Sequence, residues 1–270
     1  MQNIQRNNAI QPPGCFHNEE VPAKRDFASL TGKEYSPEAF SWSRNEEAGQ
    51  FVASPSGRTN FYAQDVFMDK QTIIDKFGSA FIANEHTYKM GIDIRFTDHL
   101  ALRFKNLTVL ETCSGGGFSS ISLARYAKHV YSFDIDQSRI RDARANAVIA
   151  GVDSKITFLH DDIYNGIKQT ELMGRIEASF IDPDWADTGS HHIYKFINSN
   201  TRPPSDHLLT MILKLNSNVT LIQPPFIPVG EFSHLPNHEL ECLYMNNSLE
   251  LYCLHFGILA ATHGMSEYRV

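Results

Sequence analysis

The chain has 270 residues, of which 42% are hydrophobic and 20% charged, and its formal net charge is −7 at pH 7. These values describe a globular protein with room for one large α/β domain and an extension, and the negative charge argues against a broad nucleic-acid-binding surface. No apolar run approaches the roughly 18–20 residues that span a bilayer, the N-terminus lacks a signal-peptide core, and the four cysteines form no CxxC pair. We therefore expect a protein of the cytoplasm, or alternatively of the nucleus, with reduced thiols.

The first 104 residues divide into two predicted parts. Residues 1–60 are polar and punctuated by prolines, which predicts an irregular arm. Residues 61–104 are predicted to form a helical extension, because their apolar residues recur at spacings of 3, 4 and 7. These residues are Val66, Phe67, Ile73, Ile74, Phe77 and Phe81.

From residue 105 to residue 270 the pattern changes to short apolar runs separated by helical segments. The first runs begin at Thr108, Val130, Ile156, Ala178 and Val219. Such alternation predicts βαβ units and a parallel sheet covered on both faces. Two later runs, 240–245 and 249–256, flank Asn246-Asn247-Ser248 and predict an antiparallel hairpin. We therefore expect an α/β fold with a Rossmann-like sheet of seven strands, in which five parallel strands precede a C-terminal antiparallel hairpin.

A glycine-rich loop follows the first predicted strand, in the stretch VLETCSGGGF that begins at Val109. Ligands of open α/β sheets bind beyond the carboxyl ends of the strands, and glycines there let a ligand approach the backbone closely. Gly115, Gly117 and the neighbouring Cys113 are therefore candidate cofactor-binding residues. Asp134 ends the second strand about twenty residues beyond the loop, where an acid accepts hydrogen bonds from a ribose diol.

The acid before the loop decides between two kinds of cofactor. A dinucleotide site would need a third glycine near Ser120, and the carboxylate of Glu111 would repel a pyrophosphate. Glu111 instead suits a cationic ligand with an amino acid moiety. S-adenosylmethionine carries a ribose, an adenine, a sulfonium and an amino group, so it is the expected cofactor.

Residues after the second and third strands complete the predicted cofactor site. Ile135 can pack on an adenine face, and Asp162 can accept a hydrogen bond from the adenine amine. Asp161 is expected to cap the segment that follows it, and Asp136 to cap the helix after Asp134.

The fourth strand ends in ASFIDPDW, residues 178–185, which indicates the chemistry of the methyl acceptor. Exocyclic amines of nucleobases are poor nucleophiles because their lone pair is delocalised into the ring. The Asp182 carboxylate and the Pro183 carbonyl can accept the N–H bonds of such an amine and turn its lone pair toward the methyl group. Trp185 offers a face on which a base can stack. We therefore expect Asp182, Pro183 and Trp185 to form the acceptor site.

The stretch from about Gly91 to Trp185 resembles the trimethylguanosine synthase family, the RNA cap guanine-N2 methyltransferases. The glycine loop, the Phe-Asp-Ile-Asp strand end at 133–136 and the D-P-x-W motif match that family in order and spacing. The resemblance implies a class I methyltransferase fold and transfer of methyl to N2 of a guanine in an RNA or cap-like nucleotide. It also implies that Phe96 and Thr97 contribute to the cofactor pocket.

Two positions depart from the pattern of that family. Asp184 stands where a second proline is usual, and Phe118 stands where an asparagine is usual. Asp184 is expected to add negative charge near the acceptor and to loosen the turn.

Three other functions fit the same residues. They are amino-methylation of adenine or cytosine, N-methylation of a small molecule, and a catalytically inactive scaffold that binds S-adenosylmethionine. His191-His192 has no carboxylate or cysteine at ligand spacing, so no metal is expected. Arg139, Arg141 and Arg144 are interpreted as a solvated helix face. The expected partner is an RNA or guanine nucleotide substrate, without a membrane.

Overall fold

In a computed structural model of the chain, the structure describes residues 40–45, 50–55, 68–168, 175–185 and 193–270. The chain forms two compact units, Met1–Gln64 and Asp65–Val270. The first contains an antiparallel strand pair, β1 (Phe40–Asn45) and β2 (Gln50–Pro55). The sequence predicts an irregular arm in this range, so the observed strand pair differs from that prediction. The prediction weighted the prolines and overlooked the short run FSWSRN, which alternates in polarity.

The second unit begins with helices, in the range where a helical extension is predicted. They are α2 (Lys70–Phe77), α3 (Glu85–Met90), α4 (Ile94–Ala101) and the 3-10 turn η2 (Leu102–Phe104). Asp69 begins α2 by accepting a 3.0 Å hydrogen bond from the Thr72 amide, and Gly78 ends it in a left-handed conformation with φ 77°. Asn84 and Thr87 form a capping box on α3.

An eight-stranded sheet forms the centre of the second unit, in the order β10-β8-β9-β7-β6-β3-β4-β5. Its strands are β3 (Thr108–Glu111), β4 (His129–Asp134), β5 (Ile156–His160), β6 (Ala178–Ile181), β7 (Val219–Gln223), β8 (His238–Met245), β9 (Ser248–Phe256) and β10 (Gly264–Arg269). Strands β3 to β7 pair in parallel, and β9 is antiparallel to β7 and β8. The predicted parallel sheet with a C-terminal hairpin is confirmed.

Two details refine this prediction. The hairpin turns at Asn246 and Asn247, whose φ angles of 50° and 66° suit the tight turns that join twisted strands. Strand β10 adds an eighth strand, which pairs in parallel with β8 at the edge of the sheet. Its residues GMSEYR are largely polar and half-buried or exposed, so no apolar run marks it in the sequence.

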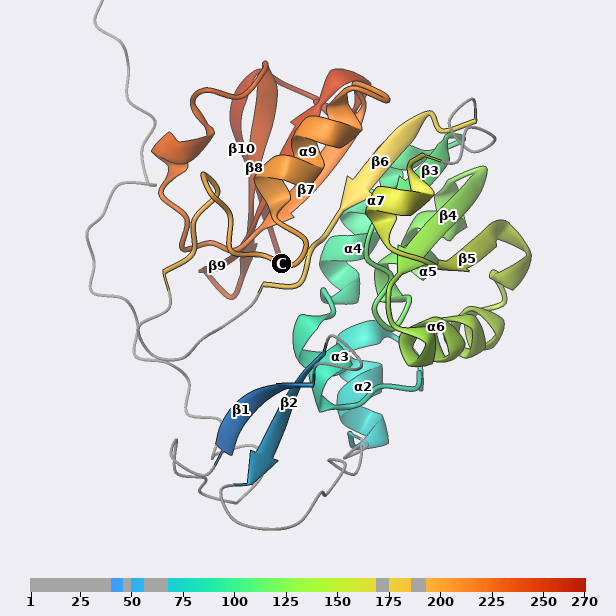
Figure 1. The fold of residues 1–270 in the computed structure, drawn as a ribbon. Coiled ribbons are helices and arrows are strands. Elements are labelled where there is room, and N and C mark those ends of the chain that lie inside the picture. Colours follow the sequence, from blue (N-terminus) through green and yellow to red (C-terminus); the bar gives the residue numbers. More distant parts are fainter. Residues whose placement is uncertain (1–39, 46–49, 56–67, 169–174, 186–192) are drawn as a thin grey trace, which may run out of the picture. The chain divides into compact units, whose positions relative to one another are not determined.

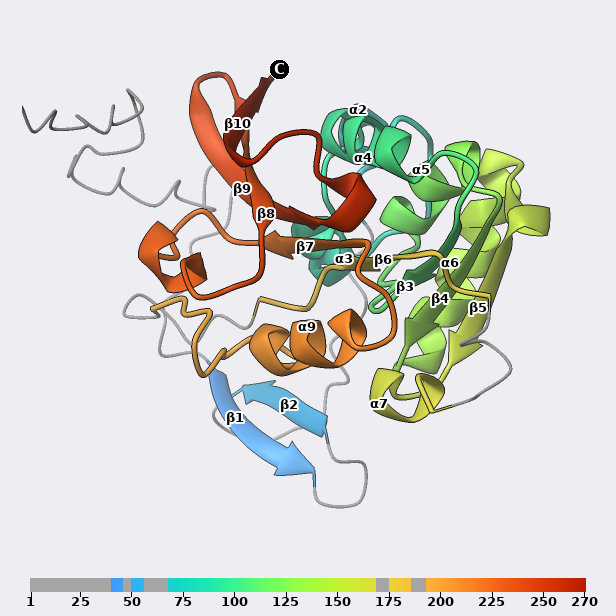
Figure 2. The ribbon, with the colours of Figure 1, turned by 90° about the horizontal axis from the view of Figure 1, so that it is seen from above.

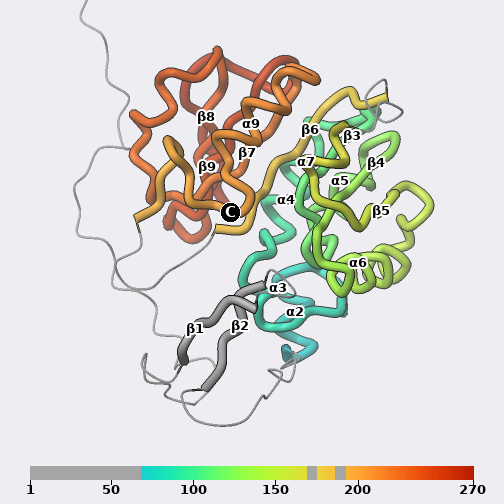
Figure 3. Tube along the Cα trace, viewed as in Figure 1, coloured from blue at the N-terminus to red at the C-terminus, as the bar shows by residue number. Residues whose placement is uncertain are grey.

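Helices cover both faces of the sheet (Figures 1 and 2). One face carries α4, α5 (Phe118–Tyr126) and α6 (Gln137–Ala150), and the other carries α7 (Ile163–Gly166) and α9 (Ser205–Leu213). The 3-10 turns η3 (Asp153–Lys155), η4 (Val229–Phe232) and η5 (Gly257–Leu259) lie in the connections. Figure 3 follows the same order along the Cα trace.

Buried aromatic rings join the N-terminal helices of this unit to the sheet. Phe77 of α2 stacks on Phe118 at the start of α5, with ring centroids 3.8 Å apart. Phe104 meets Phe180 of β6 edge to face at 6.0 Å. Because these rings are buried, the helical extension and the sheet share one hydrophobic core.

Among the described residues no helix is long and apolar enough to cross a membrane.

Candidate functional site

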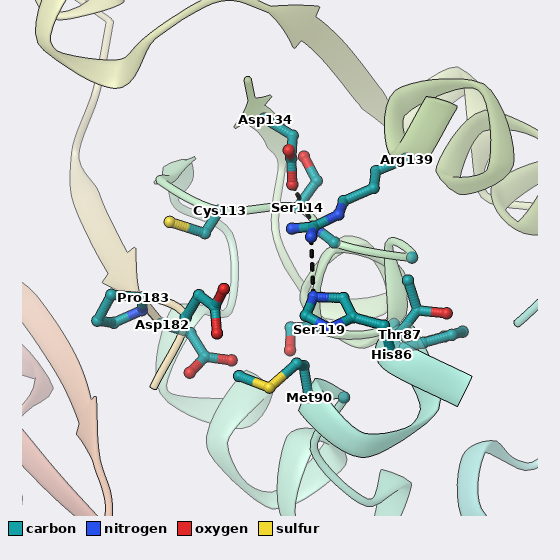
Figure 4. A pocket seen from close by; sticks show the side chains of 15 residues that line it. His86, Thr87, Met90, Cys113, Ser114, Ser119, Asp134, Arg139, Asp182 and Pro183 are labelled. Carbon is teal, nitrogen blue, oxygen red and sulfur yellow. Dashed lines mark hydrogen bonds between the residues drawn. The ribbon is translucent and has the colours of Figure 1, made fainter. Parts of the chain in front are cut away.

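A cavity of about 60 Å³ lies at the carboxyl ends of β3, β4 and β6, beside helix α3 (Figure 4). Figure 4 shows the side chains of Cys113, Asp134, Asp182 and Pro183 around it. With Gly115, these are five of the residues that the sequence predicts to bind a cofactor or an acceptor. The parallel sheet brings them together because consecutive parallel strands end at the same edge.

The shape of the glycine loop requires glycine at two positions. Gly115 and Gly117 have φ angles of 52° and 80°, which side chains rarely adopt. A Cβ atom on Gly117 would lie 2.9 Å from the Cβ of Ala143 in α6, whereas one on Gly115 would meet nothing within 4 Å. Gly117 therefore serves helix packing, and Gly115 leaves room for a ligand against the backbone.

Asp134 holds the loop and the start of α6 with its two carboxylate oxygens. Its Oδ2 accepts a 2.8 Å hydrogen bond from the Gly115 amide, and its Oδ1 accepts one of 2.9 Å from the Asp136 amide. The side chain is 6% exposed, and burial raises its pKa. Each oxygen has one backbone donor, so each retains a lone pair for a ligand hydroxyl. Ile135 beside it is 71% exposed and does not line the cavity.

Glu111 lies one layer behind the cavity and does not line it. Its Oε2 accepts hydrogen bonds from the hydroxyls of Ser120 and of Ser132, the latter at 2.6 Å. Ser132 in turn contacts Ser114, a lining residue, at 2.6 Å between hydroxyls. The other oxygen, Oε1, is buried without a hydrogen-bond partner among the described residues. Burial raises the pKa of Glu111 to about 7, although the two serines act to lower it.

The acceptor motif, residues 182–185 after β6, lines two different cavities. Asp182, Pro183 and Asp184 line the first cavity, and burial raises the pKa of Asp182 well above its usual value, with further increases from Glu111 and Asp184. Trp185 faces a neighbouring cavity and packs against the core. Its indole Nε1 is buried and has no partner among the described residues.

Contacts with Arg202 hold the backbone at Asp184 in place, which corrects the expectation that Asp184 loosens the turn. Its backbone N–H donates to the Arg202 carbonyl at 3.0 Å, and its carbonyl accepts from the Arg202 N–H at 2.8 Å. Its carboxylate also pairs with the Arg202 guanidinium at 3.0 Å. A proline at this position has no N–H to donate. The substitution therefore exchanges the rigidity of a proline ring for an antiparallel bridge.

Two residues predicted for the cofactor pocket lie elsewhere. Phe96 is buried and lines the neighbouring cavity. The Thr97 hydroxyl lies 2.9 Å from that of Ser122 and joins α4 to α5. Both belong to helix packing rather than to the first cavity.

The cap that the sequence predicts at Asp161 lies at Asp162. Asp162 begins α7 and accepts a 2.9 Å hydrogen bond from the Tyr164 amide. Asp161 accepts from the Asp162 amide at 2.8 Å. Neither lines the first cavity, whereas the predicted cap Asp136 does begin α6, accepting from Ser138 at 2.8 Å.

Helices α3 and α6 also contribute residues to the cavity, and the sequence does not predict them there. His86, Met90 and Arg139 line it, and a guanidinium nitrogen of Arg139 lies 2.8 Å from Nε2 of His86 (Figure 4). Burial and the nearby Arg139 lower the pKa of His86. The sequence predicts a solvated helix face for Arg139, because periodicity alone does not show that its side chain turns toward Asp134. No motif marks α3.

Metal ligands and reactive thiols are not evident in the described part of the chain. No group of three or more histidine, cysteine or acidic residues there is arranged so that it could hold a metal ion, and His191-His192 falls outside it. Burial raises the pKa of Cys113, so this thiol stays protonated and is a poor nucleophile.

The residues in and around the first cavity suit the expected cofactor, S-adenosylmethionine. Asp134 offers acceptors for a ribose, Ile135 an apolar surface for a base, and the acids Glu111 and Asp182 a negative potential for a cationic group. The cavity itself is narrow, because Arg139 and His86 meet at its edge.

Comparison with known proteins gives a family resemblance and a fold. Residues 106–238 match the sequence profile of the RNA cap guanine-N2 methyltransferase family. The structure is similar to that of a proposed methyltransferase from Porphyromonas gingivalis W83, with a TM-score of 0.58 and 13% identity. The match covers 71% of this chain and 48% of that one, so this chain spans about half the length of that protein.

Two further solved structures are more distantly similar. A proposed O-methyltransferase from Klebsiella pneumoniae has 18% identity and a TM-score of 0.45, over 64% of this chain and 86% of that one. TrmK of M. capricolum, solved with S-adenosyl-homocysteine, has 14% identity and a TM-score of 0.39, over 63% and 69%. The likeness to the Porphyromonas gingivalis structure, together with the order of the sheet, gives this chain the fold of the class I methyltransferases.

Proposed function

We propose that this protein transfers a methyl group from S-adenosylmethionine to N2 of a guanine. The proposal rests on its class I methyltransferase fold and on the resemblance of its sequence to the RNA cap guanine-N2 methyltransferases. The observation that carries this proposal is the first cavity itself. It joins an acid suited to a ribose, Asp134, to a carboxylate and a carbonyl suited to an amine, Asp182 and Pro183. A cofactor and an acceptor amine can therefore meet there.

The cofactor is proposed to lie along the strand ends, with its ribose on Asp134 and its adenine on Ile135. Gly115 leaves room for it beside the backbone. Glu111 acts as a buried charge behind Ser114 and Ser132 and favours the cationic methionine end. Because Arg139 contacts His86 at 2.8 Å, this contact must open to widen the cavity for the cofactor.

When bound, S-adenosylmethionine supplies an electrophilic methyl group: the N–C bond forms as the S–C bond breaks, the electron pair stays on sulfur, and the amine loses one proton. Asp182 and the Pro183 carbonyl accept the N–H bonds of the acceptor, which directs its lone pair. The raised pKa of Asp182 makes its ionised carboxylate a suitable acceptor for the proton. Most of the rate enhancement comes from positioning and from the electrostatic setting.

Calorimetric titration with S-adenosyl-homocysteine tests the cofactor. We expect binding that Asp134→Ala weakens at least tenfold, because charged hydrogen bonds contribute about 1.5–3 kcal/mol each. Asp142→Ala is the matched control, since Asp142 pairs with Arg141 on α6 and not with the cavity. Absence of binding by the unmodified protein would refute the proposal.

A methylation assay tests the acceptor. Capped RNA oligonucleotides with guanosine or inosine at the cap are compared, because inosine lacks only the N2 amine. We expect methyl incorporation with guanosine alone, lost in Asp182→Ala while cofactor binding persists. Incorporation into the inosine cap, or into adenosine or cytidine, would show that another atom is the acceptor.

A further inference from the structure

A hollow of about 410 Å³ lies at the amino ends of β3, β4 and β5, opposite the carboxyl ends that form the first cavity. Among the described residues no acid lines it, and Asp153, two residues before Lys155, lies outside its wall. Acids line both the first cavity and its neighbour. We call this site the basic hollow because four cations line it, Lys105, Arg125, Lys128 and Lys155.

Two of these cations are fixed at the end of α5. The Lys155 Nζ donates to the carbonyls of Ala124 and Ala127, which lie 2.9 and 3.1 Å away. A helix end leaves such carbonyls without partners in the helix. Arg125 donates through one nitrogen to both oxygens of Asp98, at 2.7 and 2.9 Å. The Lys155 ammonium has three donors, so one of them is left for a ligand.

The other two cations, Lys105 and Lys128, are exposed. Their ammonium groups form no hydrogen bond or ion pair with a described residue. Lys128 lies near the exposed Glu177, whose pKa is lowered by hydrogen bonds from Thr108 and further by the charge of Lys128. Two of the four cations therefore have an acid close by and two do not, which leaves the basic hollow with surplus positive charge.

The lining of the basic hollow suits a phosphate backbone better than a protein surface. Lysine ammonium groups bind phosphate oxygens as point charges. Asn106 and Tyr126 add an amide and an aromatic ring to the wall, and such groups contact the sugars and bases of nucleic acids. A protein interface needs an apolar centre, whereas Ala127 is the one aliphatic residue that lines the hollow in the described part of the chain.

Helix α5 connects the basic hollow with the first cavity. Phe118 and Ser119 at its start line the first cavity, and Arg125 and Tyr126 at its end line the basic hollow. The helix has nine residues, which at about 1.5 Å each separate the two sites by about 14 Å along its axis. A stacked RNA strand rises about 3.4 Å per nucleotide, so about four nucleotides cover this distance.

We propose that the basic hollow binds the phosphate backbone of the RNA substrate, several nucleotides beyond the guanine that receives the methyl group. This inference rests on the proposed function and adds a second contact with the same RNA. It also explains how a chain with a net charge of −7 holds a polyanion, because positive charge is concentrated in one hollow.

Fluorescence anisotropy with labelled capped RNA tests the proposal on the full chain saturated with S-adenosyl-homocysteine. The probe has about ten nucleotides, more than the four that span α5. In Lys105→Gln/Lys128→Gln we expect affinity to fall about tenfold and the slope of log affinity against log salt to fall by about 1.4, for two lost phosphate contacts. The rate of methylation of a cap dinucleotide, which does not reach the hollow, should be unchanged.

Two further variants serve as controls. Lys105→Arg/Lys128→Arg keeps both charges and should retain RNA binding. Lys168→Gln/Lys214→Gln removes the same charge beside α7 and α9, on the other face of the sheet, and should change affinity by less than about twofold.

Three outcomes would overturn the proposal. The first is an equal loss of affinity in Lys168→Gln/Lys214→Gln, which would show that only net charge matters. The second is an unchanged salt slope in Lys105→Gln/Lys128→Gln. The third is displacement of the RNA by polyglutamate at the same concentration of charge, which would assign the hollow to an acidic protein.

This proposal and the proposed function fail in distinguishable ways. Absence of S-adenosyl-homocysteine binding by the unmodified protein refutes the methyltransferase proposal. Methylation of the cap dinucleotide, together with RNA binding that does not depend on Lys105 and Lys128, refutes only the assignment of the basic hollow.

Discussion

Two clusters of buried acids lie in the same sheet and are held in opposite ways. Glu239 and Glu241 of β8 are almost fully paired: Arg103 donates to Glu239 at 2.8 Å, and the ring nitrogens of His99 and His255 lie 2.7 and 2.9 Å from the two oxygens of Glu241. Burial acts to raise the pKa values of these acids, yet the hydrogen bonds hold both below their usual range.

Glu111, behind the first cavity, and Asp182, which lines it, have no such cation among the described residues. Glu111 is paired only with serines, and Asp182 lies near two other acids, so burial prevails and raises both pKa values. The paired cluster stabilises the fold close to the edge strand β10. In the proposed function, the unpaired acids supply negative potential for a cationic ligand when they are ionised.

The largest effect is expected in the paired cluster. Arg103→Ala leaves two buried carboxylates without their main cation, which should lower the free energy of unfolding by about 3–5 kcal/mol. Urea denaturation measures it. The matched control is Arg125→Ala, whose partner Asp98 is more exposed and whose loss should cost less than about 1 kcal/mol. Equal effects of the two variants would contradict the comparison.

The unpaired cluster should respond with the opposite sign. Glu111→Gln should raise the free energy of unfolding at pH 8 by up to about 3 kcal/mol and weaken cofactor binding. The folded-state pKa of about 7 lies above the usual 4.5, so the folded protein holds the proton more tightly and loses stability as pH rises through this window. Urea denaturation at pH 4 and pH 8 measures the gain, which should vanish at pH 4. A Glu85→Gln control should show no gain at either pH.

Cofactor affinity should depend on pH for the same reason. If S-adenosylmethionine requires ionised Glu111, its apparent affinity should rise about tenfold from pH 6 to pH 8, as the ionised fraction rises. Calorimetry at the two pH values measures this rise. In Glu111→Gln the affinity should be low and independent of pH. A flat profile for the unmodified protein would show that the charge of Glu111 is not sensed by the ligand.

The smallest effect concerns the bridge at Asp184. Asp184→Ala removes only the partly exposed ion pair, with a loss of less than about 1 kcal/mol, whereas Asp184→Pro also removes a backbone hydrogen bond of about 1 kcal/mol. We expect methylation to fall further in the proline variant, although it restores the residue usual in the family. Higher activity with proline would mean that the bridge to Arg202 does not position the motif.

The residues that directly follow a predicted strand were the ones that the sequence could bring together. The glycine loop, Asp134 and Asp182–Pro183 follow β3, β4 and β6, and the parallel topology alone gathers them at one edge. The strand pattern was accessible for the same reason, since each buried strand carries an apolar run. Strand β10 lacks such a run and was missed.

Residues that depend on side-chain direction or distant packing could not be predicted. Glu250 and Tyr88 come from β9 and α3, and only the folded chain shows that they share a cavity with the predicted Trp185. Arg139 lies on a helix whose periodicity does not reveal which side chain turns inward. The helix cap lies at Asp162 instead of Asp161, a displacement of one residue that spacing does not resolve.

The position of Asp134 and Asp182 in one cavity has a consequence for reaction order. In the proposed reaction a cofactor on Asp134 and an acceptor amine on Asp182 are bound at the same time, so neither has to leave before the other enters. Initial-rate plots should then show intersecting lines, as for a ternary complex, and not the parallel lines of a ping-pong reaction. S-adenosyl-homocysteine should compete with the methyl donor alone, and the methylated base should be able to depart while the spent donor remains bound.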